Sequence, residues 1–190
     1  MKLRIQILTA LTALIAVASL SLPRSGLAQK SYALGISGGV AIPAGNFGDS
    51  VSTGYAVTGF IALGVPDLPV GVRFDGVFNK FKGRGFPGVG GAGRQIDDVR
   101  VMGVLGSLIY SFSGTTAKPY LITGGGIYNL KADAQGAKSQ NEFGFNAGFG
   151  ATFGVRSLAG FIEARYHGVS RDQANGGNVQ FVPITLGIMF

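Results

Sequence analysis

Beyond residue 28, apolar side chains recur at every second position over segments of roughly ten residues, the length that a transmembrane strand needs. In residues 142–155, for example, Phe143, Phe145 and Phe149 alternate with glycines and small polar residues. A period of two puts successive side chains on opposite faces of a β-strand. Eight segments follow this pattern: 32–42, 54–65, 70–80, 99–112, 119–130, 142–155, 160–169 and 179–190. Because no helical pattern of any length accompanies them, the sequence predicts an all-β fold.

The connections between these segments alternate in length. The short ones are residues 66–69, 113–118 and 156–159, and the long ones are residues 43–53, 81–98, 131–141 and 170–178. Short periplasmic turns and longer extracellular loops are the layout of outer-membrane barrels, which have an even number of strands. We therefore expect an eight-stranded antiparallel up-and-down transmembrane β-barrel.

The alternation alone does not say whether the apolar face points outward to lipid or inward, as in a soluble lipocalin-like barrel. Charged residues make up only 13% of the chain and hydrophobic residues 46%, whereas about a quarter of an ordinary soluble protein is charged. Segments 32–42, 54–65 and 179–190 contain no charged residue on either face. Their less apolar face is rich in Gly, Ala, Ser and Thr, which suit a narrow lumen. These features predict that the apolar face contacts lipid.

Segments 99–112 and 119–130 are the hardest to orient. The first is apolar on both faces, and we expect its outward residues to be Met102, Val104, Leu108, Tyr110 and Phe112. In the second we expect the outward residues to be Tyr120, Ile122, Tyr128 and Leu130. With these choices all six tyrosines lie near strand ends on outward faces, where amphipathic rings form interfacial belts. The predicted periplasmic belt contains Tyr32, Tyr110, Tyr120 and Phe190, and the predicted outer belt contains Tyr55, Tyr128 and Tyr166.

The first 28 residues have the features of a secretory signal peptide. Lys2 and Arg4 precede the apolar stretch 5–22, Pro23 ends it, and Gly26 to Ala28 offer the small residues of a cleavage site. We expect cleavage after Ala28, which leaves residues 29–190 as the barrel domain and directs it to the bacterial outer membrane. The alternative is an uncleaved membrane anchor, since the apolar stretch is long for a signal.

Composition excludes several kinds of site. The chain has no Cys and one His, which excludes disulfides, thiolate metal sites and His-rich metal sites, and no metal or cofactor is expected. Three of its 16 basic residues lie within the predicted signal peptide. The net charge of +7 therefore owes much to that segment and does not indicate nucleic-acid binding.

Four charged residues are expected inside the barrel. Arg73 and Asp75 occupy the less apolar face of segment 70–80, and Glu163 and Arg165 occupy that of segment 160–169. These strands are four apart in an eight-stranded meander, so they stand on opposite walls. We expect Arg73 to face Glu163 and Asp75 to face Arg165. Because buried charges must be paired, the sequence predicts an ion-pair network that plugs the lumen; a gate that opens when the pairs exchange is the alternative.

Three stretches resemble the outer-membrane β-barrel family that includes OmpA-type and opacity-type proteins. They are Lys118 to Gly126 (KPYLITGGG), Glu163 to Tyr166 (EARY) and the closing Val182 to Phe190 (VPITLGIMF). The resemblance implies periplasmic chaperones and insertion by the barrel-assembly machinery, which in this family reads a terminal aromatic residue. It also implies contact with outer-membrane lipid and lipopolysaccharide. We expect a monomer, and no wall-anchoring domain of the two-domain OmpA kind after Phe190.

The expected function is non-enzymatic, with a structural or surface-interaction role. One alternative is a lipid A deacylase, for which Glu163, His167 and Ser170 are the candidate residues; otherwise His167 is expected at the rim of the lumen. Residues three apart on a strand point to opposite faces, which disfavours a catalytic group. A second alternative is a narrow solute pore. The basic stretch 80–87 is a solvated loop or a contact for lipopolysaccharide phosphates or a host surface.

Overall fold

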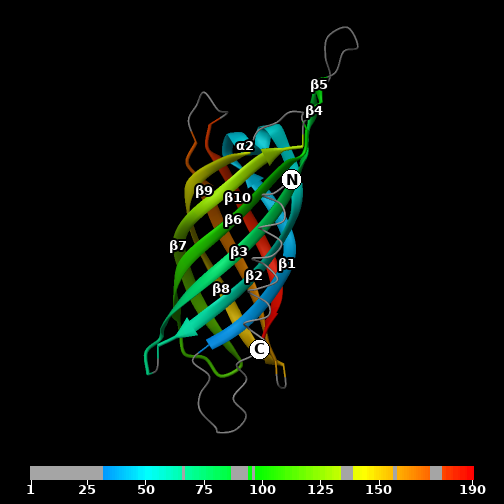
Figure 1. Ribbon diagram of the computed structural model, residues 1–190. Coiled ribbons are helices and arrows are strands. Elements are labelled where there is room, and N and C mark those ends of the chain that lie inside the picture. The colour runs from blue at the N-terminus through cyan, green and yellow to red at the C-terminus, as the bar shows by residue number, and fades with distance from the viewer. Residues whose placement is uncertain are drawn as a thin grey trace, which may run out of the picture. The chain divides into compact units, whose positions relative to one another are not determined.

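The computed structural model describes residues 32–65, 67–86, 94–95, 97–133, 139–155, 158–171 and 177–190. The predicted signal peptide lies outside these residues. The elements, labelled as in Figure 1, are β1 (Tyr32–Ala44), α2 (Gly45–Ser50), β2 (Val51–Gly64), β3 (Val70–Gly83), β4 (Gly85–Phe86), β5 (Arg94–Gln95), β6 (Val99–Ser111), β7 (Ala117–Ala132), β8 (Gln140–Val155), β9 (Leu158–Val169) and β10 (Val179–Met189).

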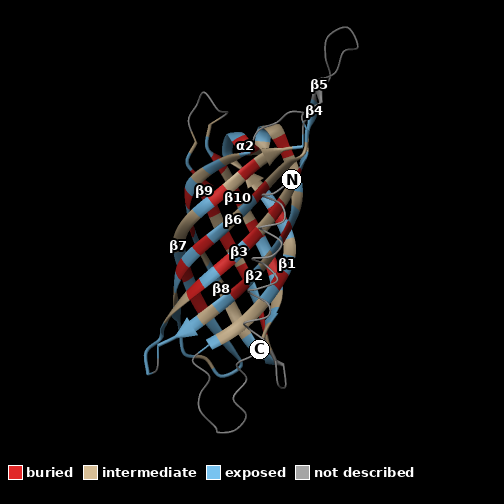
Figure 2. Cartoon of the chain, in the orientation of Figure 1, coloured by how far each residue is buried: buried red, intermediate tan, exposed pale blue. Residues whose placement is uncertain are grey.

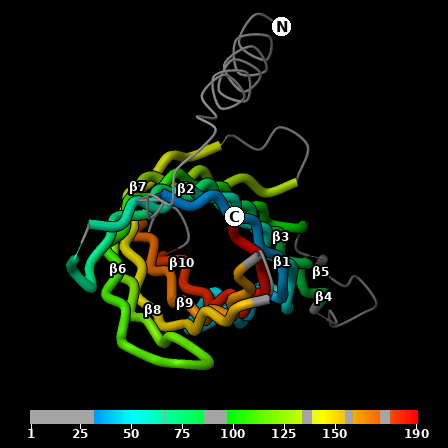
Figure 3. The backbone as a smooth tube through the Cα atoms, turned by 90° about the horizontal axis from the view of Figure 1, so that it is seen from below, coloured from blue at the N-terminus to red at the C-terminus, as the bar shows by residue number. Residues whose placement is uncertain are grey.

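Eight of the strands form a closed antiparallel barrel in the order β1-β10-β9-β8-β7-β6-β3-β2, which confirms the predicted fold. The view along the barrel shows the closed ring (Figure 3). Closure joins the first strand to the last, with the backbones of Leu34 and Phe190 exchanging hydrogen bonds of 3.0 and 2.9 Å. Closure leaves no unpaired sheet edge, which a strand protein within lipid requires.

The two ends of the barrel differ. The end that carries Tyr32 and Phe190 has the short turns and is here called the turn end; the opposite end, with α2 and the β4–β5 ribbon in Figure 1, is the loop end. Neither α2 nor the ribbon is predicted by the sequence pattern. Gly45, at φ 56°, supplies the left-handed backbone that turns the chain out of β1, and α2 buries Phe47 against the barrel. Among the residues that the structure describes, no helix is long and apolar enough to cross a membrane.

The strands run further toward the loop end than the alternation predicts. β2 begins at Val51, which pairs with Gly83 of β3, and β8 begins at Gln140, which pairs with Leu130 of β7. These extensions continue the hydrogen-bonded ladder through residues that no longer alternate between apolar and small side chains. The sequence pattern marks the apolar band, and the ladder continues past it.

Large apolar side chains are exposed on the outside of the barrel, as expected, and Figure 2 shows buried and exposed residues following each other along the strands. The predicted outward side chains of segment 99–112 are all exposed. Strand β7 is the exception, because its faces are reversed: Leu121 and Ile127 are 51% and 61% exposed, whereas Tyr120, Ile122, Tyr128 and Leu130 are buried in the lumen. The assignment of Tyr120 and Tyr128 to the interfacial belts is therefore wrong. Both phenol hydroxyls have hydrogen-bond partners inside the barrel, which the lipid core does not provide.

The barrel interior is layered. An apolar cluster fills the loop end, a polar layer crosses the middle, and an aromatic pair lies nearer the turn end. The largest members of the apolar cluster are Phe47, Phe81, Leu105, Tyr128, Leu130 and Phe181. This arrangement places the charged residues between two apolar layers.

Candidate functional site: a charged layer in the lumen

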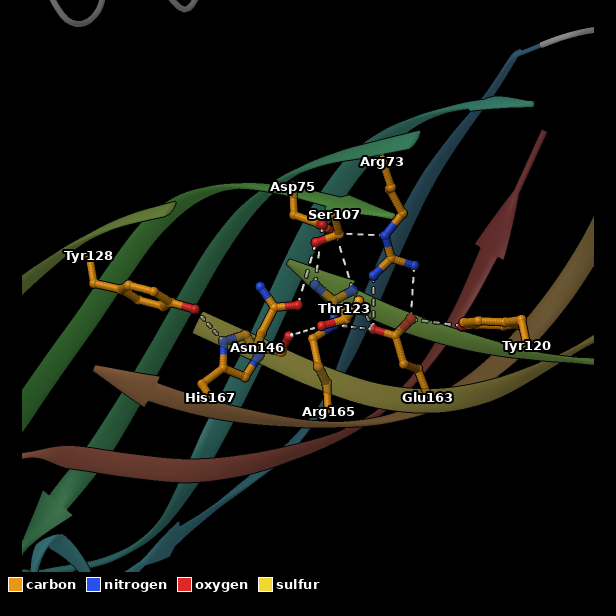
Figure 4. A network of polar contacts seen from close by, with 10 residues as sticks. All are labelled: Arg73, Asp75, Ser107, Tyr120, Thr123, Tyr128, Asn146, Glu163, Arg165 and His167. Carbon is orange, nitrogen blue, oxygen red and sulfur yellow. Dashed lines mark hydrogen bonds and ion pairs between the residues drawn. The ribbon is translucent and has the colours of Figure 1, made fainter. Parts of the chain in front are cut away.

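The charged layer joins opposite walls of the barrel. β3 and β9 are four strands apart in both directions around the barrel. The inward-facing positions of each of these strands carry one basic and one acidic side chain. Figure 4 shows Arg73 and Asp75 approaching Glu163 and Arg165 across the lumen. All four residues are 6% exposed or less.

The four charges form a closed ring of contacts. Arg73 makes a two-pronged bond to Glu163, with Nη1–Oε2 and Nη2–Oε1 distances of 2.8 and 2.9 Å. Arg165 donates to both carboxylates, at 3.2 Å to Asp75 Oδ2 and 2.7 Å to Glu163 Oε1. The Nε of Arg73 lies 2.9 Å from Oδ1 of Asp75. Each arginine thus touches both carboxylates, and the layer carries no net charge.

Two further residues contact the four charged side chains on the side facing the turn end. Tyr120 donates a 2.8 Å hydrogen bond from its hydroxyl to Oε2 of Glu163. The guanidinium of Arg73 lies 4.4 Å from the ring centroid of Phe60, which packs edge-on against Phe161 at 5.5 Å. Hydrogen bonds to a charged acceptor and cation–π contacts are both stronger away from water. These neighbours fix the rotamers that the ion pairs require.

A second polar group lies between the ring and the loop end. The hydroxyl of Tyr128 lies 2.7 Å from Nδ1 of His167, and Ser107 donates to Oδ1 of Asn146 at 3.4 Å. The imidazole of His167 stacks on Phe181, with centroids 4.9 Å apart and planes 3° apart. His167 is only 2% exposed, so its predicted place at the rim is wrong.

Three aromatic rings, those of Phe47, Phe81 and Phe181, shield His167 from solvent at the loop end; we call them the aromatic cap. Phe181 contacts Phe81 edge-on at 5.3 Å, and Phe81 contacts Phe47 of α2 at 5.1 Å. Phe181 of β10 is the cross-strand partner of His167, and Phe81 of β3 and Phe47 of the helix continue the aromatic contacts toward the loop end. The sequence pattern does not predict α2, and therefore does not predict the cap.

A cavity of about 250 Å³ opens on the other side of the ring, toward the turn end. Its lining includes Phe60, Arg73, Ile109, Tyr120 and Met189. The cavity ends where Arg73 and Tyr120 meet Glu163. In the described part of the barrel, the lumen is thus a vestibule closed by the charged ring and then by the aromatic cap.

The other predicted site residues lie apart from this layer. Tyr32, Tyr55, Tyr110 and Phe190 are exposed on the outer surface, and Tyr166 is partly exposed there against Phe145. Ser170 is exposed beyond the end of β9. The carboxylate of Glu163 is occupied by two arginines and a tyrosine, and the δ-nitrogen of His167 by Tyr128. The structure therefore does not assemble the three candidate deacylase residues into a catalytic group.

The sequence pattern assigns Tyr120 and Tyr128 to the outer face instead of the lumen, and it does not single out Asn146 as a polar contact of the lumen. A signal for the two tyrosines was present, because Leu121 and Ile127 share the opposite parity of β7. Placing the tyrosines outward forces these two large aliphatic side chains into a narrow lumen. Asn146 lies on the predicted inner face of β8 but carries no charge, so the need to pair buried charges does not point to it.

The chain folds into a closed eight-stranded antiparallel barrel with apolar side chains outside and a charged layer inside. These features define the eight-stranded β-barrel fold of outer-membrane proteins. Neisserial surface protein A (NspA) has a similar crystal structure, with a TM-score of 0.63 and 17% sequence identity over 84% of this chain and 96% of that one.

Two further solved barrels are similar with lower scores. The N-terminal barrel domain of Pseudomonas aeruginosa OprF has a TM-score of 0.48 and 14% identity, over 83% of this chain and 97% of that one. Yersinia pestis Ail, solved in complex with the heparin analogue sucrose octasulfate, has a TM-score of 0.47 and 16% identity, over 84% and 99%. No protein-family model and no curated protein matches the sequence.

Proposed function

We propose that the protein is an integral outer-membrane β-barrel with a charge-plugged lumen and a structural or surface-interaction role. The observation that carries the proposal is the inverted distribution of polarity. Large apolar side chains are exposed around the outside, while two arginines and two carboxylates are buried inside. Lipid is the solvent that suits the outer face, and only paired charges suit the inner one.

The proposed orientation places the turn end in the periplasm and the loop end outside the cell. Short periplasmic turns and long extracellular loops are the usual layout of such barrels. The segments that would meet other molecules are then α2, the β4–β5 ribbon and the remaining loop-end connections. The similarity to a neisserial surface protein supports a surface role.

The route to the membrane is part of the proposal. Residues 1–28 act as a cleavable signal peptide, and periplasmic chaperones and the barrel-assembly machinery then act on residues 29–190. Lipid and lipopolysaccharide surround the finished barrel, which acts as a monomer.

A cell-fractionation experiment tests this function. The full chain is expected in the outer-membrane fraction, beginning at Gln29 by mass spectrometry. It should migrate faster on a gel when unheated than when boiled, because a closed barrel resists detergent. The matched control lacks residues 2–28 and is expected to stay in the cytoplasm. Recovery of the full chain as a soluble periplasmic protein would contradict the proposal.

The gate alternative makes a different use of the same ring. Opening would require the arginines to exchange carboxylates, yet each arginine already contacts both. Exchange therefore offers no new pairing, which favours a plug.

A further inference from the structure

Three basic residues lie directly abreast on the outer surface at the loop end. Lys80 of β3 pairs in register with Arg100 of β6, and Arg100 pairs with Lys131 of β7. All three lie on the outward face of their strands, because they are separated by an even number of residues from Phe74, Met102 and Ile127, which are exposed on the same strands. Lys82, also exposed, lies two residues further along β3. We call Lys80, Lys82, Arg100 and Lys131 the cationic row.

The row is unfavourable for the isolated chain. Like charges directly opposite each other on neighbouring strands destabilise a sheet. Lys80 is compensated, because its Nζ lies 3.0 Å from Asp133 Oδ2 and 3.4 Å from Asp98 Oδ2. Within the described ranges, no carboxylate lies within 4.0 Å of the charged groups of Arg100 or Lys131. Four cations and two carboxylates leave the group with a net charge of +2.

The hydrogen bond from Lys80 also acts on the carboxylate that receives it. It lowers the pKa of Asp133, which lies just beyond the end of β7. Asp133 therefore stays ionised at neutral pH, and its hydrogen bond is made with Lys80. Arg100 and Lys131 also favour the ionised form of Asp133 through their charges, but only Lys80 lies within ion-pair distance of its carboxylate, so the hydrogen-bond donors of Arg100 and Lys131 remain available to an outside anion.

The row borders an apolar surface. The next outward row toward the turn end contains Phe78, Met102 and the polar Asn129, and the one after it contains Gly76, Val104 and Ile127. Val104 and Ile127 are among the most exposed apolar side chains of the molecule. A Cβ on Gly76 would approach only the carbonyl oxygen of Gly59, at 3.9 Å. The surface below the row is thus flat at Gly76 and apolar beside it.

Positive charge at this position is confined to one side of the barrel. In the described residues, the outward positions at the loop ends of β1, β2, β8, β9 and β10 are uncharged: Ile42, Tyr55, Asn141, Tyr166 and Gln180. A general attraction to an anionic membrane surface would not need three cations in one register. The grouping on three neighbouring strands indicates a discrete ligand.

We propose that the cationic row binds the phosphate groups of lipopolysaccharide, with the acyl chains of its lipid A part lying over Val104 and Ile127. This inference rests on the proposed outer-membrane function, because it requires the apolar band to face lipid. A soluble polyanion would match the charge but would leave the bordering apolar surface unused. A phosphorylated glycolipid matches both parts, and its negative charge removes the repulsion between Arg100 and Lys131.

Binding of purified lipid A to the folded protein in non-ionic detergent tests the proposal. The test variant is R100Q/K131Q, and the matched control is K118Q/R171Q, which removes two cations elsewhere. Each cation near a lipid surface contributes about 1 kcal/mol, or about fivefold in affinity. The test variant should therefore bind bisphosphorylated lipid A more weakly by about tenfold or more, and the control within about twofold of the unmodified protein.

The unfolding temperature supplies a second readout, because the proposal predicts opposite effects of the variant with and without lipid A. Without lipid A, R100Q/K131Q should unfold at the same or a higher temperature than the unmodified protein, because the repulsion is gone. With lipid A, the unmodified protein should gain stability and the variant should not. Equal stabilisation of both proteins would overturn the proposal, as would equally tight binding of dephosphorylated lipid A or of phosphatidylglycerol.

The proposed function is checked in the same samples. Heat-modifiable migration shows that each variant has formed the barrel before lipid A is added. A protein that forms no heat-modifiable barrel refutes the membrane function, whereas a barrel that ignores lipid A phosphates refutes only the cationic site.

Discussion

Glu163 has the most connections of any residue in the charged layer, because it accepts hydrogen bonds from Arg73, Arg165 and Tyr120. A buried ion pair adds little to stability relative to an apolar pair, but removing one partner leaves a charge that lipid and protein cannot solvate. The ring therefore tolerates no single loss, even though its total contribution is modest.

The first prediction follows from this asymmetry. Glu163→Gln should lower the free energy of unfolding by about 3–5 kcal/mol, since two arginines are left with one carboxylate. Tyr120→Phe removes only one hydrogen bond to a charged group and should cost about 2 kcal/mol. Urea unfolding in lipid vesicles, followed by the loss of heat-modifiable migration, measures both.

A charge exchange controls for simple disruption of packing. Glu163→Arg alone should destabilise the barrel strongly, and combining it with Arg73→Glu should recover part of the loss. If the double variant is no more stable than the single one, the direct pairing of residues 73 and 163 does not govern stability.

At the scale of single residues, the sequence is enough to predict the ion pairs in the lumen but not the tyrosines that lie around them. The pairing of Arg73 with Glu163 follows from strand parity and a four-strand separation, both of which depend only on topology. Alternation assigns Tyr120 and Tyr128 to the wrong face because β7 carries large apolar side chains on both faces, with three consecutive glycines between the two tyrosines. In such a strand, hydrogen-bond partners from other strands decide which face turns inward, and alternation does not reveal these partners.

At the scale of elements, the small helix α2 closes the loop end. Its sequence, GNFGDS, has poor helix-forming residues, and a six-residue helix is not stable alone. Packing of Phe47 on Phe81 holds it in place, which is why the local sequence does not predict it. The eight long strands, in contrast, follow from the period-two pattern, because that pattern is set by the lipid and the lumen on their two sides.

The second prediction concerns this helix. Phe47→Ala should lower the free energy of unfolding by about 3 kcal/mol, the loss typical for a large buried aromatic ring. Asn46→Ala, an exposed change in the same helix, is the matched control and should have little effect. An equal effect of the two changes in a urea titration would show that the ring does not anchor α2.

The third prediction concerns the last strand. Phe190 is exposed on the outer surface, while its backbone closes the barrel against Leu34. Phe190→Ala should therefore leave the stability of the finished barrel nearly unchanged but slow its assembly in cells, if the assembly machinery reads the terminal ring. Pulse–chase labelling of the heat-modifiable form measures the rate. Phe149→Ala, an exposed mid-strand change, should not slow assembly, and an equal delay would contradict a role for the terminal position.

At the scale of the whole molecule, closure of the sheet explains the composition. Eight strands leave a lumen just wide enough for side chains to fill, so the few charges of the membrane-spanning region gather in one compensated layer. The other charges of the described residues lie toward the two ends, and at the loop end they include the cationic row. The low charged fraction of 13% is that of a protein whose outer surface meets lipid instead of water.

Electrical recording in a planar lipid bilayer tests the plugged barrel most directly. Protein first shown to be heat-modifiable, and therefore folded, is inserted and held under voltage. Because the charged ring and the aromatic cap close the lumen in series, the membrane should show no discrete current steps above its baseline. Stable, repeated steps of one size from the unmodified protein would show an open pathway through the lumen and would contradict the plug.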